Sequence, residues 1–264
     1  MTIHPTAIIH PNAKIGTNVQ IGAYSIVGEH VSLGDNIVLH SHVVVEGRTS
    51  VGEGTRIFPF ASIGHAPQDL KFHGEESQLI IGKNNMIREH VTMNPGTESG
   101  GMVTKVGDNC LFMMSVHIAH DCQIGNNVIM ANNATLGGHV HVGDFAFIGG
   151  LAAVHQFIRI GNHAVIGGMS GVENDVIPYG RVKGERAFLA GLNLIGLERR
   201  GFGKDDIRVL QKAYNQLFAD DGTLEQRLEQ VEKDFAAQPQ VMELIKFARE
   251  KTRFPLCQPS RKAA

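Results

Sequence analysis

Residues 15–34 read IGTNVQIGAYSIVGEHVSLG, and an aliphatic side chain followed mostly by glycine returns in them every six residues. The same period runs without a slip from Ile3 to Ile63 and, after two interruptions, from Val106 to Val172. An amphipathic helix repeats its apolar face about every 3.6 residues and a half-buried strand every second residue, so a period of six fits neither. Hexapeptide repeats are typical of a parallel β-helix, in which three short strands complete each coil. The repeat therefore predicts an all-β parallel β-helix whose coils take eighteen residues each.

Two segments interrupt this repeat. Residues 66–80 keep its phase but show little of its pattern, and residues 95–105 break the phase with a glycine-rich run. Both are predicted to be loops that leave the β-helix, and loops on a rigid scaffold are where binding groups tend to lie.

The repeat stops near Pro178, and helical signals follow it. Residues 205–219 carry apolar side chains at helical spacing, Thr223 and Gln226 form a capping-box pattern, and Pro239 is suited to opening a third helix that would end near Thr252. The predicted organisation is a β-helix over residues 1–187 and a small α-helical domain over residues 188–264.

The composition excludes several classes of protein. The chain has 264 residues, 42% of them hydrophobic, and a formal net charge of −2, so it lacks the diffuse basic surface of many nucleic-acid binders. The sequence shows no signal-peptide pattern and no run of about 20 apolar residues, which predicts a cytoplasmic protein without a membrane span. Cys110, Cys122 and Cys257 have no metal-ligand spacing and are expected to be buried apolar side chains.

Because each coil takes eighteen residues, two residues separated by eighteen positions in the sequence should lie on neighbouring coils, at a distance of about 4.8 Å. His120 is thereby stacked with Gly138 and Gln156, and Asp121 with His139. A histidine can remove a proton from a hydroxyl, a neighbouring carboxylate can orient it, and a glycine lets its backbone N–H approach an oxyanion closely. The column is therefore predicted to catalyse acyl transfer, with a substrate hydroxyl as the nucleophile.

Other interpretations of the same residues remain open. His117 and His120, with His139 or His155, could hold a catalytic Zn²⁺ ion, as carbonic-anhydrase-like proteins on this fold do. Asp121 could instead be a corner residue that caps a turn. The whole β-helix could also be a non-catalytic scaffold, because repeat proteins offer long surfaces for docking.

Six segments carry a resemblance to a known family: Gln68–Lys71, His117–Cys122, Ala131–Ala134, Gly137–His139, His155–Phe157 and Asn193–Phe202. They resemble the UDP-N-acetylglucosamine O-acyltransferases that start lipid A biosynthesis, and the resemblance covers essentially the whole chain. It implies a homotrimer of left-handed β-helices with active sites in the clefts between subunits. The implied reaction moves a 3-hydroxyacyl group from the phosphopantetheine arm of acyl carrier protein to the 3-hydroxyl of UDP-N-acetylglucosamine, with no metal and no other cofactor.

The resemblance also implies residue roles. His120 matches the general base, Asp121 the carboxylate that orients it, and Gly138 the backbone oxyanion donor. Gly168 lies at the position that ends the acyl groove, where a glycine leaves the groove open to a longer chain. The remaining positions that resemble substrate-binding residues, of which the final three would hold the nucleotide end, are Gln68, Asp69, Lys71, His117, His139, His155, Gln156, Asn193, Arg199 and Arg200.

Three positions depart from the family's commonest pattern. Asn94 and Arg186 stand where histidine is frequent, and Ile195 stands where an acidic residue is frequent. These departures leave the acceptor contacts open, including the choice between UDP-N-acetylglucosamine and its 3-amino analogue.

A basic contact surface is expected because acyl carrier protein is acidic. Six basic residues close in sequence could supply it, or they could be solvated charges that balance Glu185 and Glu198. The six are Arg181, Lys183, Arg186, Arg199, Arg200 and Lys204.

Overall fold

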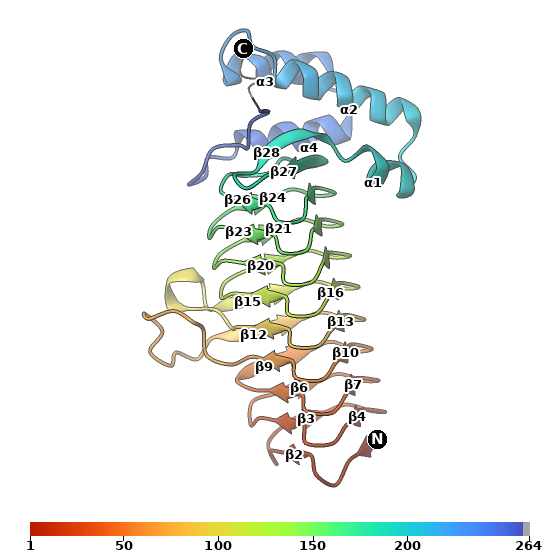
Figure 1. Cartoon of the computed structure of the whole chain (residues 1–264), viewed down its shortest axis with the longest axis vertical. Coiled ribbons are helices and arrows are strands. Elements are labelled where there is room, and N and C mark those ends of the chain that lie inside the picture. Colours follow the sequence, from red (N-terminus) through yellow and green to blue (C-terminus); the bar gives the residue numbers. More distant parts are fainter. Residues whose placement is uncertain (261–264) are drawn as a thin grey trace.

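The structure is a computed structural model that describes residues 1–260, so residues 261–264 of the predicted helical domain lie outside it. Figure 1 shows a tall column of stacked coils with the helices gathered at one end and the N-terminus at the other. A yellow and orange loop region projects from the middle of the column (Figure 1). Among the described residues, no helix is both long enough and apolar enough to cross a membrane.

The column is built from three sheets, called A, B and C here in the order in which the chain visits them. Sheet A consists of β1 (Thr2–Ile3), β4 (Gln20–Ile21), β7 (Val38–Leu39), β10 (Arg56–Ile57), β13 (Met86–Ile87), β16 (Leu111–Phe112), β19 (Ile129–Met130), β22 (Phe147–Ile148), β25 (Val165–Ile166), β27 (Gly180–Lys183) and β28 (Phe188–Leu192). Sheet B consists of β2 (Ile8–Ile9), β5 (Ile26–Val27), β8 (Val44–Val45), β11 (Ser62–Ile63), β14 (Thr92–Met93), β17 (His117–Ile118), β20 (Thr135–Leu136), β23 (Ala153–Val154) and β26 (Gly171–Val172). Sheet C consists of β3 (Lys14–Ile15), β6 (Ser32–Leu33), β9 (Arg48–Val51), β12 (Gln78–Ile81), β15 (Val103–Val106), β18 (Gln123–Ile124), β21 (His141–Val142) and β24 (Arg159–Ile160).

The register of these strands explains the six-residue period. In the two-residue strands the second side chain points inward, and from β4 onward it is buried, so Ile57, Ile63 and Phe112 are all 0% exposed. Thr135 of β20 pairs with His117 one coil below and with Ala153 one coil above, which is the eighteen-residue step. The core is therefore a stack of single inward side chains, one from each strand. The first residue of each two-residue strand points outward and can be polar.

The corners of the coils need a left-handed backbone. Asn, which tolerates this conformation, occupies many of them, but bulky and charged residues occupy others. At the corner between sheets B and C, Asp121, His139 and Phe157 have φ values of 60°, 61° and 67°. Asp121 is therefore a corner residue, as one interpretation of the sequence holds, and its place on the corner also turns its side chain toward His120.

Both predicted loops leave the column at the corner between sheets B and C. The first connects β11 to β12, and the second connects β14 to β15 and contains a short 3-10 helix, η1 (Glu98–Gly100). The second loop lengthens its coil, so that Ile81 pairs with Val106 instead of the residue eighteen positions on. This insertion is the physical cause of the phase shift in the repeat.

The carboxyl-terminal part closes the column. Strands β27 and β28 form an antiparallel hairpin on the last coil, a feature that the sequence analysis missed. Four helices follow within residues 1–260: α1 (Leu194–Arg199), α2 (Lys204–Leu217), α3 (Leu224–Asp234) and α4 (Pro239–Arg249). The capping box of Thr223 and Gln226 and the opening of α4 at Pro239 are confirmed, although α4 ends at Arg249 rather than near Thr252, and α1 was not predicted. The division of the chain at residue 187 stays a prediction.

Candidate active site

His120 and Asp121 follow β17 at the corner between sheets B and C. The Nδ1 atom of His120 lies 2.7 Å from Oδ2 of Asp121, and the carboxylate is only 1% exposed. The backbone N–H of Thr97 donates to Oδ1 of Asp121 over 2.9 Å, and the Thr97 hydroxyl donates to Oδ2 over 2.6 Å. Burial by itself would raise the pKa of Asp121, but the hydrogen bonds from His120 and Thr97 outweigh it and hold that pKa below its usual value. An ionised Asp121 keeps the Nδ1–H tautomer of His120 and leaves Nε2 free to accept a proton.

Gly138 lies one coil above His120 and against its ring. A Cβ atom at Gly138 would be 2.5 Å from Cε1 and 2.6 Å from Nε2 of His120, so only glycine allows the ring to take this position. Within residues 1–260, no acceptor meets the backbone N–H of Gly138. Gly138 thus offers an unpaired backbone N–H from the coil next to the base, as an oxyanion donor requires.

His139 occupies the next corner, directly above Asp121. Its ring centroid is 5.0 Å from that of His120 at a nearly perpendicular angle, and it stacks on Phe157 at 4.2 Å. Burial, the largest influence, lowers the pKa of His139, although the charge of Asp121 acts in the opposite direction. On the other side of His120, Oδ2 of Asp69 lies 3.9 Å from Nε2, which is too far for a hydrogen bond and leaves room for a substrate group.

His120, His139 and Asp69 line an open cleft of about 440 Å³ at the corner between sheets B and C, whereas Asp121 and Gly138 are not among the residues that line it. The predicted site residues that the cleft brings together are Gln68, Asp69, Lys71, His120, His139 and Gln156. Three further residues line it that the sequence analysis did not assign: Ser99, Phe157 and Arg253. Ser99 lies in the predicted loop 95–105 and Phe157 ends a motif already singled out, but no sequence signal pointed to Arg253, which returns to the cleft from beyond α4.

Comparison with known proteins gives matches over the whole chain. A family model described as UDP N-acetylglucosamine O-acyltransferase, domain 2, matches residues 175–257, and a model of the bacterial transferase hexapeptide matches residues 1–34, 12–47 and 104–138. The acyl-[acyl-carrier-protein]–UDP-N-acetylglucosamine O-acyltransferase of Caulobacter vibrioides is 52% identical over 261 residues, which is 99% of each chain. The protein of the same name from Methylobacterium radiotolerans is 61% identical over 204 residues, 77% of this chain and 75% of the relative. This chain belongs to that O-acyltransferase family.

Solved structures agree with this family. A crystal structure of a UDP-N-acetylglucosamine acyltransferase superposes with a TM-score of 0.95 at 43% identity, covering 99% of this chain and 100% of the other. The enzyme from Campylobacter jejuni gives a TM-score of 0.92 at 38% identity, covering 98% and 100%. The family and the left-handed β-helix that the resemblance implied are both confirmed.

Two more of the predicted site histidines lie near the cleft without lining it. His117 is half-buried on β17, where its Nδ1 atom lies 2.7 Å from Oγ1 of Thr92. Burial, and then the charge of His120, lower the pKa of His117. His155 is exposed, and its ring meets that of Phe254 at 5.4 Å.

The predicted residues for the acyl end and the nucleotide end lie elsewhere in this chain. Gly168 is exposed at the corner between sheets A and B. Asn193 is buried and caps α1, accepting from Gly196 N at 3.2 Å and donating to the His163 carbonyl at 2.9 Å. Arg199 is exposed, and the guanidinium of Arg200 lies 5.5 Å from the ring centroid of Phe145. Within one chain, none of these four lines the His120 cleft.

The same cleft holds a group of potential metal ligands. One donor atom each from His120, Asp121 and His139 lie within 4.8 Å of one another, whereas His117 and His155 are not part of this group. Both Asp121 oxygens already accept hydrogen bonds from Thr97, and one also accepts from His120. The arrangement therefore favours a carboxylate that orients an imidazole.

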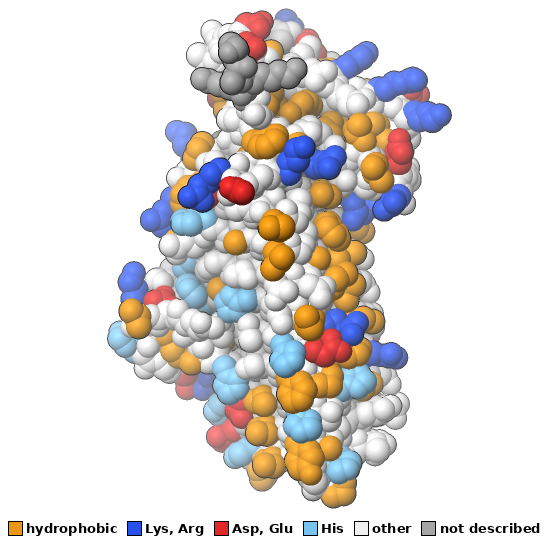
Figure 2. Space-filling model, in the orientation of Figure 1, with side chains coloured by type: hydrophobic (Ala, Val, Ile, Leu, Met, Phe, Trp, Pro, Cys, Tyr) orange, Lys and Arg blue, Asp and Glu red, His pale blue; other side chains and the backbone are white. Residues whose placement is uncertain are grey.

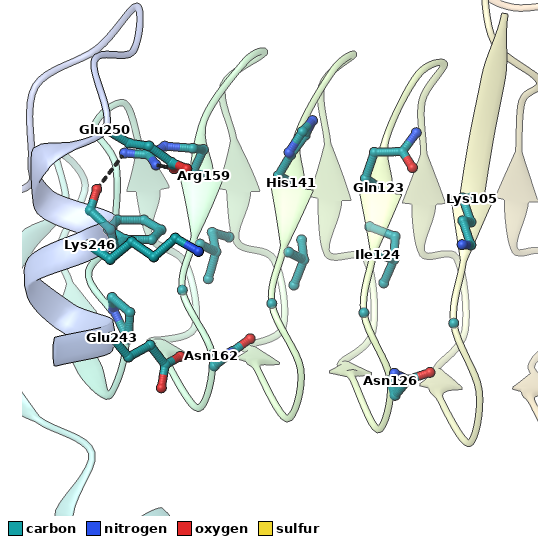
Figure 3. A pocket seen from close by; sticks show the side chains of 18 residues that line it. Lys105, Gln123, Ile124, Asn126, His141, Arg159, Asn162, Glu243, Lys246 and Glu250 are labelled. Carbon is teal, nitrogen blue, oxygen red and sulfur yellow. Dashed lines mark hydrogen bonds and ion pairs between the residues drawn. The ribbon is translucent and has the colours of Figure 1, made fainter. Parts of the chain in front are cut away.

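A groove of about 530 Å³ lies between α4 and sheet C. Figure 3 shows α4 facing a row of side chains from successive coils, namely Arg159, His141, Gln123 and Lys105. Arg159 forms ion pairs with buried Asp175, at 2.9 Å, and with Glu250 of the segment after α4. Asn162 donates to Glu243 of α4 over 2.7 Å. These contacts attach the last helix to the β-helix.

Proposed function

We propose that this chain transfers a 3-hydroxyacyl group from acyl carrier protein to the 3-hydroxyl of UDP-N-acetylglucosamine, with His120 as the general base. The observation that carries this proposal is the His120–Asp121 pair, which leaves Nε2 of His120 unpaired, with the His120 ring packed against Gly138, whose backbone N–H is also unpaired among the described residues. The relatives that share this fold are named for the acyl carrier protein and the nucleotide sugar. We include in the proposal the cytoplasmic location that the sequence predicts.

The geometry supports a direct transfer. Nε2 of His120 removes the proton from the sugar hydroxyl while that oxygen attacks the thioester carbon of the acyl carrier protein. Negative charge then develops on the former carbonyl oxygen, which accepts a hydrogen bond from the Gly138 N–H. When the intermediate collapses, the C–S bond breaks and the thiol takes the proton from His120. Asp121 stabilises the cationic imidazole throughout, and the step requires neither a metal nor a covalent enzyme intermediate.

We further propose a homotrimer in which neighbouring chains complete the site. The corner between sheets A and B exposes a line of large side chains, including Tyr24 at 60%, Phe60 at 54%, Leu151 at 60% and Met169 at 72%. Figure 2 shows hydrophobic and histidine side chains alternating down the lower half of the column. An apolar line of this length is typical of a surface that another chain covers. Gly168 lies on the same corner, so an acyl groove there would be walled by two subunits.

The basic residues at the helical end support a contact with acidic acyl carrier protein. Lys and Arg side chains gather at or near this end in Figure 2. Among the described residues, none of the six basic side chains proposed for this contact pairs with Glu185 or Glu198, and Arg186 pairs instead with Glu173 at 3.1 Å. Their charges are therefore not neutralised by Glu185 and Glu198, which favours a contact surface.

The test is acyl transfer from 3-hydroxyacyl carrier protein to UDP-N-acetylglucosamine by metal-stripped protein, with zinc analysis of the protein as purified. We expect the stripped wild type to be active and His120→Ala to lose about 10²-fold or more of its rate. His141→Ala, which removes an exposed histidine outside the cleft, is the matched control and should keep the wild-type rate. An inactive wild type that contains stoichiometric zinc would favour the zinc-dependent hydratase instead.

A further inference from the structure

The loop between β14 and β15 places one buried side chain against the acidic partner of His120. Thr97 is 3% exposed, although Glu98 and Ser99, which follow it, are exposed. Its N–H and its hydroxyl donate to different oxygens of the Asp121 carboxylate, at 2.9 and 2.6 Å. Thr97 does not line the cleft, so it acts on the reaction through its neighbours and not by touching a substrate.

The carboxylate has little other freedom. Oδ2 accepts from Nδ1 of His120 at 2.7 Å, and Nδ1 of His139 lies 3.8 Å from the same oxygen. The loop backbone covers the carboxylate so closely that a Cβ atom at Gly100 would overlap it. The orientation of the carboxylate is therefore decided by the two donors of Thr97 together with His120.

The backbone of Asp121 is held separately. Its N–H donates over 2.7 Å to the hydroxyl of Thr104, which lies on β15 of sheet C. One threonine thus holds the main chain of Asp121 and another holds its carboxylate. This division offers a matched pair of substitutions with the same change of side chain.

The hydroxyl of Thr97 also connects the carboxylate to the cleft. Its oxygen lies 3.2 Å from the hydroxyl of Ser99, which lines the cleft. Since the single hydroxyl proton of Thr97 is used by Asp121, Ser99 must be the donor in this contact. Ser99, Thr97, Asp121 and His120 thereby form one chain of hydrogen bonds from the cleft wall to the base.

We propose that Thr97 is a positioning residue for the transfer reaction: it orients the Asp121 carboxylate and limits how strongly this carboxylate holds the Nδ1 proton of His120. The inference rests on the proposed role of His120 as the base. A carboxylate that accepts three hydrogen bonds shares its negative charge among three donors. Removing the Thr97 hydroxyl concentrates this charge on His120, so that the imidazole stays protonated to a higher pH.

Other charged groups face the same pair and stay unchanged in such a variant. They are Asp69 and Lys71 of the first loop, His117 of β17, His139 of the neighbouring corner and Arg253 of the carboxyl-terminal segment. A change of pH profile in a Thr97 variant therefore reports on the contacts of the Thr97 hydroxyl, with Asp121 and with Ser99.

The experiment compares Thr97→Val, Thr97→Ser and the control Thr104→Val in the full-length protein, measuring kcat and KM across pH. We expect Thr97→Val to lose roughly tenfold or more in kcat, as for one hydrogen bond to a charged group, with KM for the nucleotide sugar little changed. The acid limb of its kcat/KM profile should move to higher pH. Thr97→Ser should restore both, and Thr104→Val should leave the acid limb in place.

The titration of His120, followed by NMR on protein labelled with ¹⁵N-histidine and assigned with His120→Gln, gives a readout that needs no turnover. Its midpoint should move to higher pH in Thr97→Val, or in Thr97→Ala if the valine variant does not fold. An unmoved midpoint and acid limb in a folded variant, or a serine variant as impaired as the valine one, would overturn the proposal. An inactive wild type would contradict the proposed function alone, because the NMR shift would still test the contact.

Discussion

The His120 cleft and the groove between α4 and sheet C differ in what their polar atoms do. The groove is the larger, about 530 Å³ against about 440 Å³. Three of its charged groups are nevertheless engaged, since Arg159 pairs with Glu250 and with Asp175, and Glu243 accepts from Asn162. At the cleft, Nε2 of His120 has no hydrogen-bond partner among the described residues, and neither has the N–H of Gly138, which packs against the His120 ring. Unpaired hydrogen-bond donors and acceptors that lie close together indicate an active site, whereas the volume of a pocket does not distinguish an active site from a contact between two elements.

The largest expected effect is on stability, where the segment around α4 attaches to the β-helix. Arg159→Leu leaves Asp175, which is 0% exposed, without its charged partner, and it also removes the contact with Glu250. Breaking a buried ion pair from one side costs about 3–5 kcal/mol. We expect the free energy of unfolding, measured by urea denaturation, to fall by this amount, while the rate per folded molecule stays near wild type.

The control for this change is Arg208→Leu, because Arg208 is 70% exposed in its pair with Asp205. An exposed pair contributes about 0–1 kcal/mol, so the two leucine variants should differ clearly. Equal losses in both would mean that Arg159 does not attach α4 in the way the contacts indicate.

The next largest effect is on the rate, in the cleft. Gly138→Ala places a methyl group 2.5 Å from Cε1 of His120, and the ring must move away from the position of the acceptor hydroxyl. We expect a loss of about 10²-fold in kcat, the range typical for a misplaced general base. A Gly138 variant with wild-type kcat would remove the ring contact from the mechanism.

The part of the site that was predictable from sequence is the part that obeys the repeat. Because one coil takes eighteen residues, the positions of His120, Gly138 and Asp121 alone predict that the glycine stacks on the histidine and that His139 stacks on the aspartate. The phase shift was also visible, and the structure attributes it to the loop between β14 and β15. The periodicity works here because every coil is built on the one below it.

The unpredicted part comes from segments that leave the repeat. Thr97 reaches Asp121 from a loop, and Arg253 reaches the cleft from the segment after α4, so no fixed spacing connects either residue to His120. The hairpin of β27 and β28 was missed for the same reason, since its antiparallel pairing ends the six-residue period. Contacts of this kind depend on tertiary packing, which a single sequence does not encode in a readable spacing.

The smallest expected effects come from two basic residues, one in the His120 cleft and one in the groove between α4 and sheet C. Arg253 lines the cleft with its guanidinium 4.5 Å from the ring centroid of Phe157, and Lys246 lines the groove on α4. Both proposed substrates carry phosphate groups, which an arginine fork binds well. We expect Arg253→Ala to raise the KM of at least one substrate roughly tenfold with kcat nearly unchanged, the size of one charge-assisted contact.

Lys246→Ala removes one positive charge, as Arg253→Ala does, but from the groove between α4 and sheet C. If the groove only attaches α4, steady-state kinetics should give a kcat and both KM values within about twofold of wild type, since no substrate loses a transition-state or ground-state contact. A rise in KM as large as that of Arg253→Ala would instead make the groove part of a substrate-binding surface. The groove between α4 and sheet C would then bind substrate as well as attach α4, and it would no longer differ in role from the His120 cleft.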